Sequence, residues 1–152
     1  SEMEKPDVTA STIISFAKKL EEDSSRFYEG LAEKFPKGKE TFLLFAEESR
    51  KNGLLVTRTY QETITDALEA GFSFRGLNLD DYPVKTTLTM GTSYPNALNM
   101  AMQLEEKASE FYLDVAERSK SLLATIPRVL RETAEKRRKR RLKLALLLNG
   151  LE

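Results

Sequence analysis

A fourteen-residue stretch occurs twice in this chain, and this repeat constrains the fold more than any other feature of the sequence. Segment 20–33 reads LEEDSSRFYEGLAE, and segment 104–117, 84 positions later, reads LEEKASEFYLDVAE. Eight of the fourteen positions are identical, whereas about one match is expected between unrelated segments of average composition. Because apolar residues recur at helical spacing in both copies, the chain is predicted to consist of two copies of one helical hairpin.

The spacing of apolar residues and of helix-ending residues predicts four long helices. The first hairpin covers 9–71 and the second covers 95–149. Segment 72–94 between them is too long for an ordinary hairpin loop, so it is predicted to be a crossover that travels the length of a bundle. The predicted helices run from Thr9 or Ser11 to about Phe35, from about Lys39 to Ala70, from Pro95 or Asn96 to about Arg118, and from about Ile126 to Leu148.

Length and composition set the broad class of the protein. A chain of 152 residues is expected to form one domain, 1–152, with a real hydrophobic core. No apolar run approaches the ~20 residues that span a bilayer, so no membrane partner is expected. The first residues lack the apolar stretch of a signal peptide, which favours a cytoplasmic location.

The sequence contains no cysteine and no histidine, which excludes several kinds of site. Without cysteine there are no disulfides, iron–sulfur clusters or thiolate zinc sites. A glycine-rich phosphate loop and a nucleophile elbow are also missing, so nothing in the sequence supports a hydrolase or a nucleotide-binding protein.

Two glutamates at matching positions of the repeat are predicted to point into the bundle. Glu21 shares a helical face with Ala17 and Tyr28. Glu105 lies on the corresponding apolar face of the second copy, with Tyr112. A buried carboxylate is costly unless it is paired or bound to a metal ion. The two glutamates therefore mark a candidate site, and each tyrosine is expected beside it, either hydrogen-bonded to a carboxylate or redox-active.

These motifs, Leu-Glu-Glu followed by Phe-Tyr and Ala-Glu, resemble the rubrerythrin branch of the ferritin-like superfamily. The resemblance implies an all-α, ferritin-like four-helix bundle made of two helical hairpins joined by a long crossover. It also implies a di-iron carboxylate centre that acts on O₂ or peroxide. In that family the first and third helices each supply a glutamate, and the second and fourth each supply Glu-x-x-His.

Both histidine positions of the family pattern are occupied by arginine in this chain. Alignment on Ala-Glu gives Glu47-x-x-Arg50 in the second helix and Glu135-x-x-Arg138 in the fourth, where Glu132 is a rival to Glu135. Guanidinium has no lone pair to give to a metal ion and carries a permanent positive charge. The resemblance therefore implies these candidate metal-binding carboxylates, in a degenerate site: Glu21, Glu47, Glu105 and Glu135.

Three functions remain open at this point. The first is a non-catalytic bundle without a cofactor, in which four glutamates pair with two arginines. About two acidic charges would then remain, to be met by protonation, by Arg137 or Arg141, or by a weakly held cation. The second is an oxidoreductase whose carboxylates hold iron or manganese.

The third possible function is an interaction module that uses the last helix. Segment 128–143 has nine basic and two acidic residues, a balance of 9 − 2 = +7. Nucleic acid or another anionic partner could bind there, and with the leucines between Leu142 and Leu148 a surface-active helix is a further possibility. The same run could also be a solvated face with one or two inward arginines. A homo-oligomer, namely a dimer, is also expected. The residues proposed for the anionic partner are Arg137, Lys139, Arg140 and Arg141.

Overall fold

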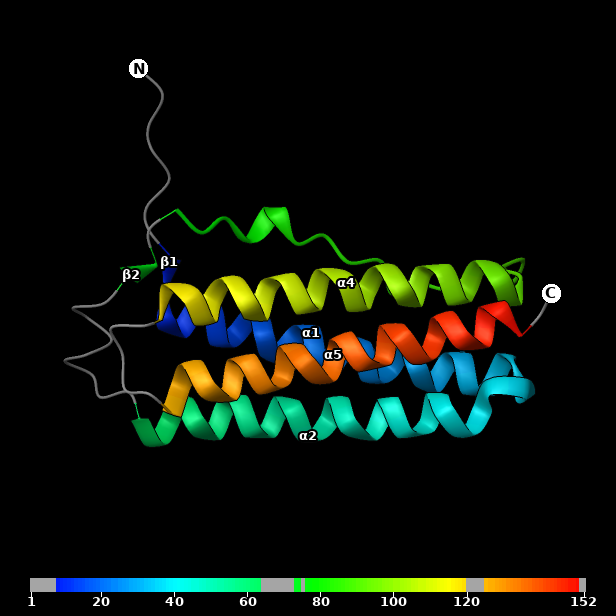
Figure 1. Ribbon diagram of the computed structural model, residues 1–152, viewed down its shortest axis with the longest axis horizontal. Coiled ribbons are helices and arrows are strands. Elements are labelled where there is room, and N and C mark those ends of the chain that lie inside the picture. Colours follow the sequence, from blue (N-terminus) through cyan, green and yellow to red (C-terminus); the bar gives the residue numbers. More distant parts are fainter. Residues whose placement is uncertain (1–7, 64–72, 75, 120–124, 151–152) are drawn as a thin grey trace, which may run out of the picture.

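Four long helices lie side by side as a bundle (Figure 1). The computed structural model describes residues 8–63, 73–74, 76–119 and 125–150. Within these residues the predicted all-α, four-helix architecture is confirmed. The helices are α1 (Ala10–Lys34), α2 (Lys39–Thr63), α4 (Tyr94–Arg118) and α5 (Thr125–Asn149).

Side-chain caps and prolines explain where the helices begin and end. The Thr9 hydroxyl accepts a hydrogen bond from the backbone N–H of Thr12 at 3.3 Å and so caps α1. Phe35 ends α1, and a short 3₁₀ helix, η1 (Pro36–Gly38), leads directly into α2. Ser93 caps α4 in the same way as Thr9 caps α1, with a proline in the first turn. The predicted end of the second helix near Ala70 lies outside the described residues.

The helices pack as two antiparallel hairpins, α1 against α2 and α4 against α5, and α2 also lies beside α5 (Figure 1). Their inward faces form one continuous apolar core. Aromatic rings fill part of it, with the Tyr28 ring in contact with Phe42 and Phe45. The largest fully buried apolar side chains outside that group are Ile13, Leu31, Leu98, Leu104, Phe111 and Leu144.

The described part of the segment between the hairpins, 73–74 and 76–93, runs along the outside of α4 to the opposite end of the bundle (Figure 1). Near its start, β2 (Ser73–Phe74) pairs antiparallel with β1 (Val8–Thr9), a contact that the sequence did not predict. A second 3₁₀ helix, η2 (Leu79–Asp81), follows. Tyr82 anchors the segment, since its hydroxyl donates to Asp114 Oδ2 at 2.5 Å. Burial and this hydrogen bond raise the pKa of Tyr82.

None of the helices in the described part of the chain is both long and apolar enough to cross a membrane.

Candidate functional site

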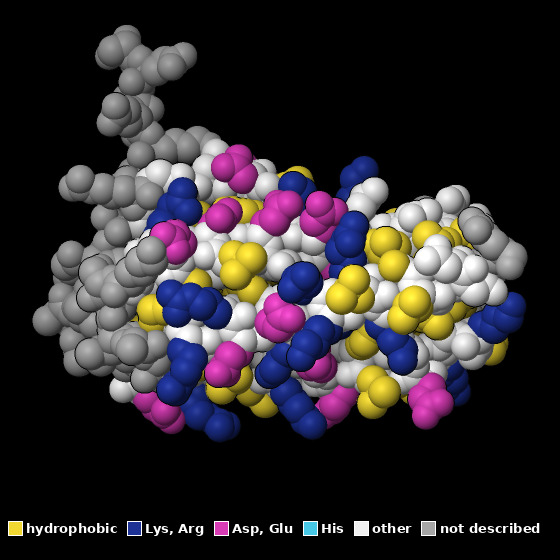
Figure 2. Space-filling view, in the orientation of Figure 1, with side chains coloured by type: hydrophobic (Ala, Val, Ile, Leu, Met, Phe, Trp, Pro, Cys, Tyr) yellow, Lys and Arg dark blue, Asp and Glu magenta, His cyan; other side chains and the backbone are white. Residues whose placement is uncertain are grey.

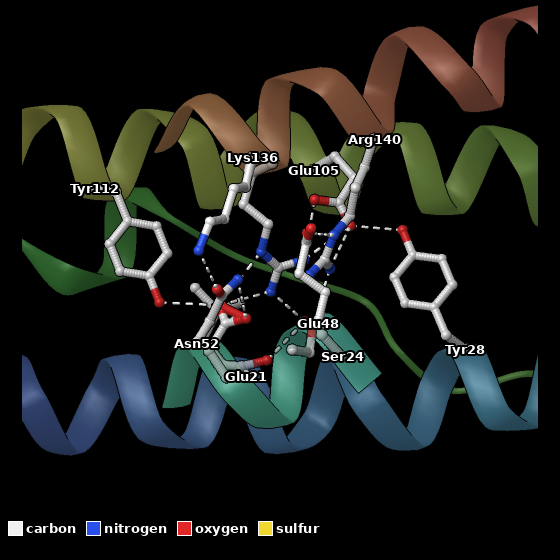
Figure 3. A network of polar contacts seen from close by, with 12 residues as sticks. Glu21, Ser24, Tyr28, Glu48, Asn52, Glu105, Tyr112, Lys136 and Arg140 are labelled. Carbon is white, nitrogen blue, oxygen red and sulfur yellow. Dashed lines mark hydrogen bonds and ion pairs between the residues drawn. The ribbon is translucent and has the colours of Figure 1, made fainter. Parts of the chain in front are cut away.

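The two glutamates of the internal repeat meet in the middle of the bundle, as their helical faces predict (Figure 3). Glu21 comes from α1 and Glu105 from α4, and their exposed fractions are 1% and 0%. Each lies seven residues, or about two helical turns, before a tyrosine of its own helix. Two carboxylates are thus buried in an otherwise apolar core, where they require positive charge or hydrogen-bond donors.

Hydrogen bonds from the two tyrosines cross between the hairpins. The Tyr28 hydroxyl of α1 donates to Glu105 Oε1 at 2.5 Å, and the Tyr112 hydroxyl of α4 donates to Glu21 Oε2 at 2.9 Å. Burial, followed by the charge of the facing glutamate, raises the pKa of each tyrosine well above 10. Both phenols therefore stay protonated and act as donors to the carboxylates.

A guanidinium group from α5 lies between the two carboxylates. Arg137 Nη1 donates to Glu105 Oε1 at 2.7 Å and Oε2 at 2.9 Å. Its Nη2 donates to Glu21 Oε2 at 2.9 Å and to Ser24 Oγ at 2.7 Å. Burial alone would lower the pKa of Arg137, but the charges of Glu105 and Glu21 outweigh this effect and raise it. Arg137 is therefore a fully buried, permanently charged bridge between the two hairpins.

A second arginine of α5 continues the network toward α2. Arg140 is 2% exposed. Its Nε donates to Glu48 Oε1 at 2.7 Å, and its Nη1 donates to Ser49 Oγ at 2.8 Å. A longer contact of 3.4 Å joins Nη1 to Glu105 Oε1. Arg140 thus connects the last helix to both the second helix and the central carboxylate of Glu105.

The guanidinium group of Arg140 also lies over two aromatic rings. Among the described residues, Arg140 Nη2 is the one buried side-chain nitrogen or oxygen atom without a hydrogen-bond partner. Arg140 Cζ lies 5.8 Å from the ring centre of Tyr28 and 5.5 Å from that of Phe45. A guanidinium over aromatic faces is attracted by their π electrons. These cation–π contacts partly replace the missing hydrogen bond.

The network is close to electrically neutral. Two fully buried carboxylates face two buried guanidinium groups. At the edge, the partly exposed Glu48, which pairs with Arg140, adds one negative charge, and Lys136 adds one positive charge. Lys136 Nζ donates to Asn52 Oδ1 at 3.4 Å, and Asn52 in turn donates to Glu21 Oε1 at 3.4 Å. The predicted surplus of about two acidic charges does not arise, because only two of the four candidate glutamates lie inside.

The predictions for the second and fourth helices were wrong about which residues point inward. The side chains of Glu47 and Glu135 are 50% and 52% exposed, and those of Arg50 and Arg138 are 48% and 66% exposed. Arg50 pairs with Glu47 at 2.7 Å, and this hydrogen bond lowers the pKa of Glu47. Arg138 pairs with Glu135 at 3.6 Å. Glu132 is also exposed, so neither rival glutamate of α5 points inward.

Other residues, two positions further along each helix, occupy the inward places. On α2 they are Ser49 and Asn52, and on α5 they are Arg137 and Arg140, all buried. Each pair has the i, i+3 spacing of Glu-x-x-His, which puts both side chains on one face. The polar centre is thus lined by Ser-x-x-Asn from one hairpin and Arg-x-x-Arg from the other.

A signal in the sequence could have found this alignment. Arg137 lies seven residues after Leu130 and seven before Leu144, both of which are buried. Ser49 lies seven residues after the buried Phe42. Residues seven apart share a helical face, so the apolar spacing placed these polar residues inward. The prediction followed the alignment on the Ala-Glu dipeptide and not this spacing, and so placed Glu47 and Glu135 inward.

An open groove of about 330 Å³ between α1 and α2 ends at this network. Gly53 forms part of its lining, and a Cβ atom there would lie 3.4 Å from the Cβ of Glu21. The missing side chain therefore lets α2 approach α1 closely beside the buried carboxylate. Charges of both signs line the groove, from Lys18, Glu22 and Arg50.

The donor set in the bundle centre does not fit a di-iron centre. In the described ranges, no group of three or more His, Cys, Asp or Glu side chains is placed to hold a metal ion. Both central carboxylates already accept hydrogen bonds from Arg137, and a dication placed there would meet its positive charge. The arrangement can bind and orient carboxylates, but it lacks the ligands that iron requires.

Comparisons with known proteins identify no relative. No protein-family model, no curated protein and no solved structure matches the chain.

Proposed function

We propose that this protein is a non-catalytic, ferritin-like bundle of rubrerythrin type, in which a buried arginine pair takes the place of the di-iron centre. The observation that carries the proposal is the position of Arg137, hydrogen-bonded to both Glu21 and Glu105. The internal repeat, the two hairpins and the segment that runs the length of α4 support the ferritin-like part of the proposal.

Guanidinium groups can replace metal ions as the positive charge in a carboxylate site. Arginine is always protonated, and its planar fork matches a carboxylate in two parallel hydrogen bonds. In this bundle Nη1 of Arg137 donates to both oxygens of Glu105, while Nε and Nη2 both donate to Oε2 of Glu21. Removal of one partner from such a buried network is strongly destabilising. The arginine pair therefore has a structural role, which is to hold the two hairpins together.

The oxidoreductase alternative has less support from the same geometry. Of the four candidate metal ligands, Glu21 and Glu105 lie in the interior, whereas Glu47 and Glu135 lie on the surface. The two tyrosines remain protonated donors to the carboxylates. Two carboxylates already bonded to guanidinium are too few to make the iron or manganese site that such an enzyme needs.

Anaerobic calorimetric titration with Fe²⁺ and with Mn²⁺ tests the proposal. We expect no stoichiometric binding by the natural protein. The positive control is the fourfold variant Ser49→Glu, Asn52→His, Arg137→Glu, Arg140→His, which restores Glu-x-x-His on both helices at the observed inward positions. We expect this variant to gain affinity for both ions, because ligand number and charge again match the family pattern.

The matched negative control is Arg50→His with Arg138→His, which introduces two histidines at exposed positions. We expect no gain in metal affinity from it. Two ions bound per natural chain would contradict the loss of the metal site. A fourfold variant that folds, as seen by circular dichroism, but binds no metal would contradict the ferritin-like arrangement of the inward positions.

A further inference from the structure

One end of the bundle carries basic charge with few acids to balance it. The chain has no Asp or Glu between Lys136 and Gly150, and the adjoining start of α4, residues 94–103, has no charged residue at all. Figure 2 shows dark blue and yellow side chains over the C-terminal half of α5, with magenta gathered along the rest of α4 and the lower edge. Arg137 and Arg140 are buried, so they do not contribute to this surface.

Exposed cations and exposed leucines share this face of α5. Leu142 and Leu146 are one turn apart and 53% and 68% exposed. The strip extends for about 12 Å, from the rise of 1.5 Å per residue. We call these residues the basic strip: Arg138, Lys139, Arg141, Leu142, Lys143 and Leu146.

Three of the four cations of the basic strip form no ion pair within the part of the chain that the structure describes. Arg138 lies 3.6 Å from Glu135. Lys139, Arg141 and Lys143 form no ion pair with any acidic residue that the structure describes. Their charge is therefore available to an anionic surface. Exposed leucines among unpaired cations also point to a contact surface, because large apolar side chains grouped on a surface usually mark an interaction site.

The chemistry of the strip discriminates among partners. A second copy of the chain, related by a twofold axis, would bring like charges together across the contact. Nucleic acid would place phosphates against Leu142 and Leu146, and the strip has no aromatic ring on which a base could stack. An anionic lipid surface suits both components, since its headgroups attract the cations and its interfacial layer accepts leucines.

We propose that the basic strip docks the bundle on an anionic phospholipid surface. Leu142 and Leu146 enter the headgroup layer, while Lys139, Arg141 and Lys143 contact lipid phosphates. The contact is peripheral. It departs from the sequence-based expectation of no membrane partner and agrees with the alternative of a surface-active last helix. It uses none of the residues in the buried network, so the test of this proposal is independent of the test of the proposed function.

Vesicle flotation of the full chain tests the proposal, with phosphatidylcholine vesicles that contain either no anionic lipid or roughly 30% phosphatidylglycerol. We expect binding that requires phosphatidylglycerol and weakens as salt is raised. The triple variant Lys139→Gln, Arg141→Gln, Lys143→Gln should bind about 100-fold more weakly, because each cation near such a surface contributes roughly fivefold. The variant Leu142→Ser, Leu146→Ser should also bind more weakly while keeping the salt dependence.

Matched controls carry the same chemical changes at exposed positions elsewhere. The charge control is Lys18→Gln, Lys51→Gln, Arg58→Gln, and the leucine control is Leu54→Ser, Leu113→Ser. Both should bind within about twofold of the natural protein, as expected for surface substitutions outside the contact. Absence of phosphatidylglycerol-dependent binding would overturn the proposal, as would equal losses in strip and control variants. Strip-dependent binding of RNA without vesicle binding would overturn it in favour of nucleic acid.

Discussion

The two hairpins of this protein contribute differently to its polar centre, although their first helices are alike. α1 and α4 each supply one glutamate and one tyrosine at matching repeat positions. α2 and α5 do not match, since Ser49 and Asn52 stand where the other hairpin has two arginines. The acidic half of the site is therefore symmetric and the basic half is not. The charge of Glu21 is neutralised from the opposite hairpin, by Arg137, and this makes the network a link between hairpins.

The largest effect is expected from two neighbouring arginines of α5 that differ in environment. Arg137 is fully buried between carboxylates, and Arg138 is exposed beside Glu135. Arg137→Met should lower the free energy of unfolding by about 3–5 kcal/mol, because it leaves two buried carboxylates without their partner. Arg138→Met should lower it by less than about 0.5 kcal/mol. Denaturant unfolding measures both, and equal effects would remove the distinction between the buried network and the surface.

Alkaline pH should weaken the link between hairpins through the two buried tyrosines. The pKa values of Tyr28 and Tyr112 are raised well above 10 in the folded state, so folding favours the protonated phenols. Their contribution is complete below pH 10, the unfolded value, and is lost as pH rises above it. The loss is about 1.4 kcal/mol per pH unit for each tyrosine, until the folded-state pKa is reached.

Unfolding free energies measured between about pH 9 and pH 11.5 would show this slope, because this pH range brackets the ordinary tyrosine pKa of about 10. The variant Tyr28→Phe, Tyr112→Phe is the control, since it keeps every other ionisable group of the chain. If the variant showed the same slope as the natural protein, the tyrosines would not be its source.

Single replacements of these tyrosines compare the two matching hydrogen bonds, Tyr28 to Glu105 and Tyr112 to Glu21. Each of Tyr28→Phe and Tyr112→Phe removes one hydrogen bond to a buried carboxylate, and each should lower the free energy of unfolding by about 1.5–3 kcal/mol. Because the bonds cross between hairpins at matching positions, the two losses should be similar. Calorimetric or denaturant unfolding of both variants is the measurement. A large loss for one and none for the other would show that the crossed pair is not equivalent.

The smallest effect is expected at Arg50, on the outer side of α2. Its guanidinium pairs with Glu47 and Glu29, but all three side chains are about half exposed. Arg50→Met should therefore change the free energy of unfolding by at most about 1 kcal/mol, and less at high salt. A loss comparable to that of Arg137→Met would mean that the exposed cluster, too, holds the hairpins together.

Apolar spacing was a better guide to this site than motif alignment. It predicted four helices and the inward glutamates, because a stripe at helical spacing has to face the core. The same spacing around Leu130 and Leu144 marks Arg137 as inward, but the Ala-Glu alignment placed Glu135 there instead. Arginine is rarely fully buried, so the prediction followed the family pattern, which places a glutamate inward, and not the helical spacing, which places Arg137 inward.

Some features had no signal in the sequence. The β1–β2 pair contains two residues per strand, too few to show the alternation that identifies a strand. The position of Arg140 over the rings of Tyr28 and Phe45 depends on three helices at once. Contacts of this kind follow from tertiary packing, and local patterns do not determine them.

A thermodynamic cycle tests most directly the claim that Arg137 neutralises the two central carboxylates. Its corners are the natural protein, Arg137→Met, the pair Glu21→Gln with Glu105→Gln, and all three changes together. We predict a coupling energy of about 2–3 kcal/mol. Each partial variant leaves a buried charge without its partner, whereas the variant with all three changes leaves none, so its loss should be smaller than the sum of the other two. Additive losses, within about 0.5 kcal/mol, would contradict the account, because the three side chains would then not interact.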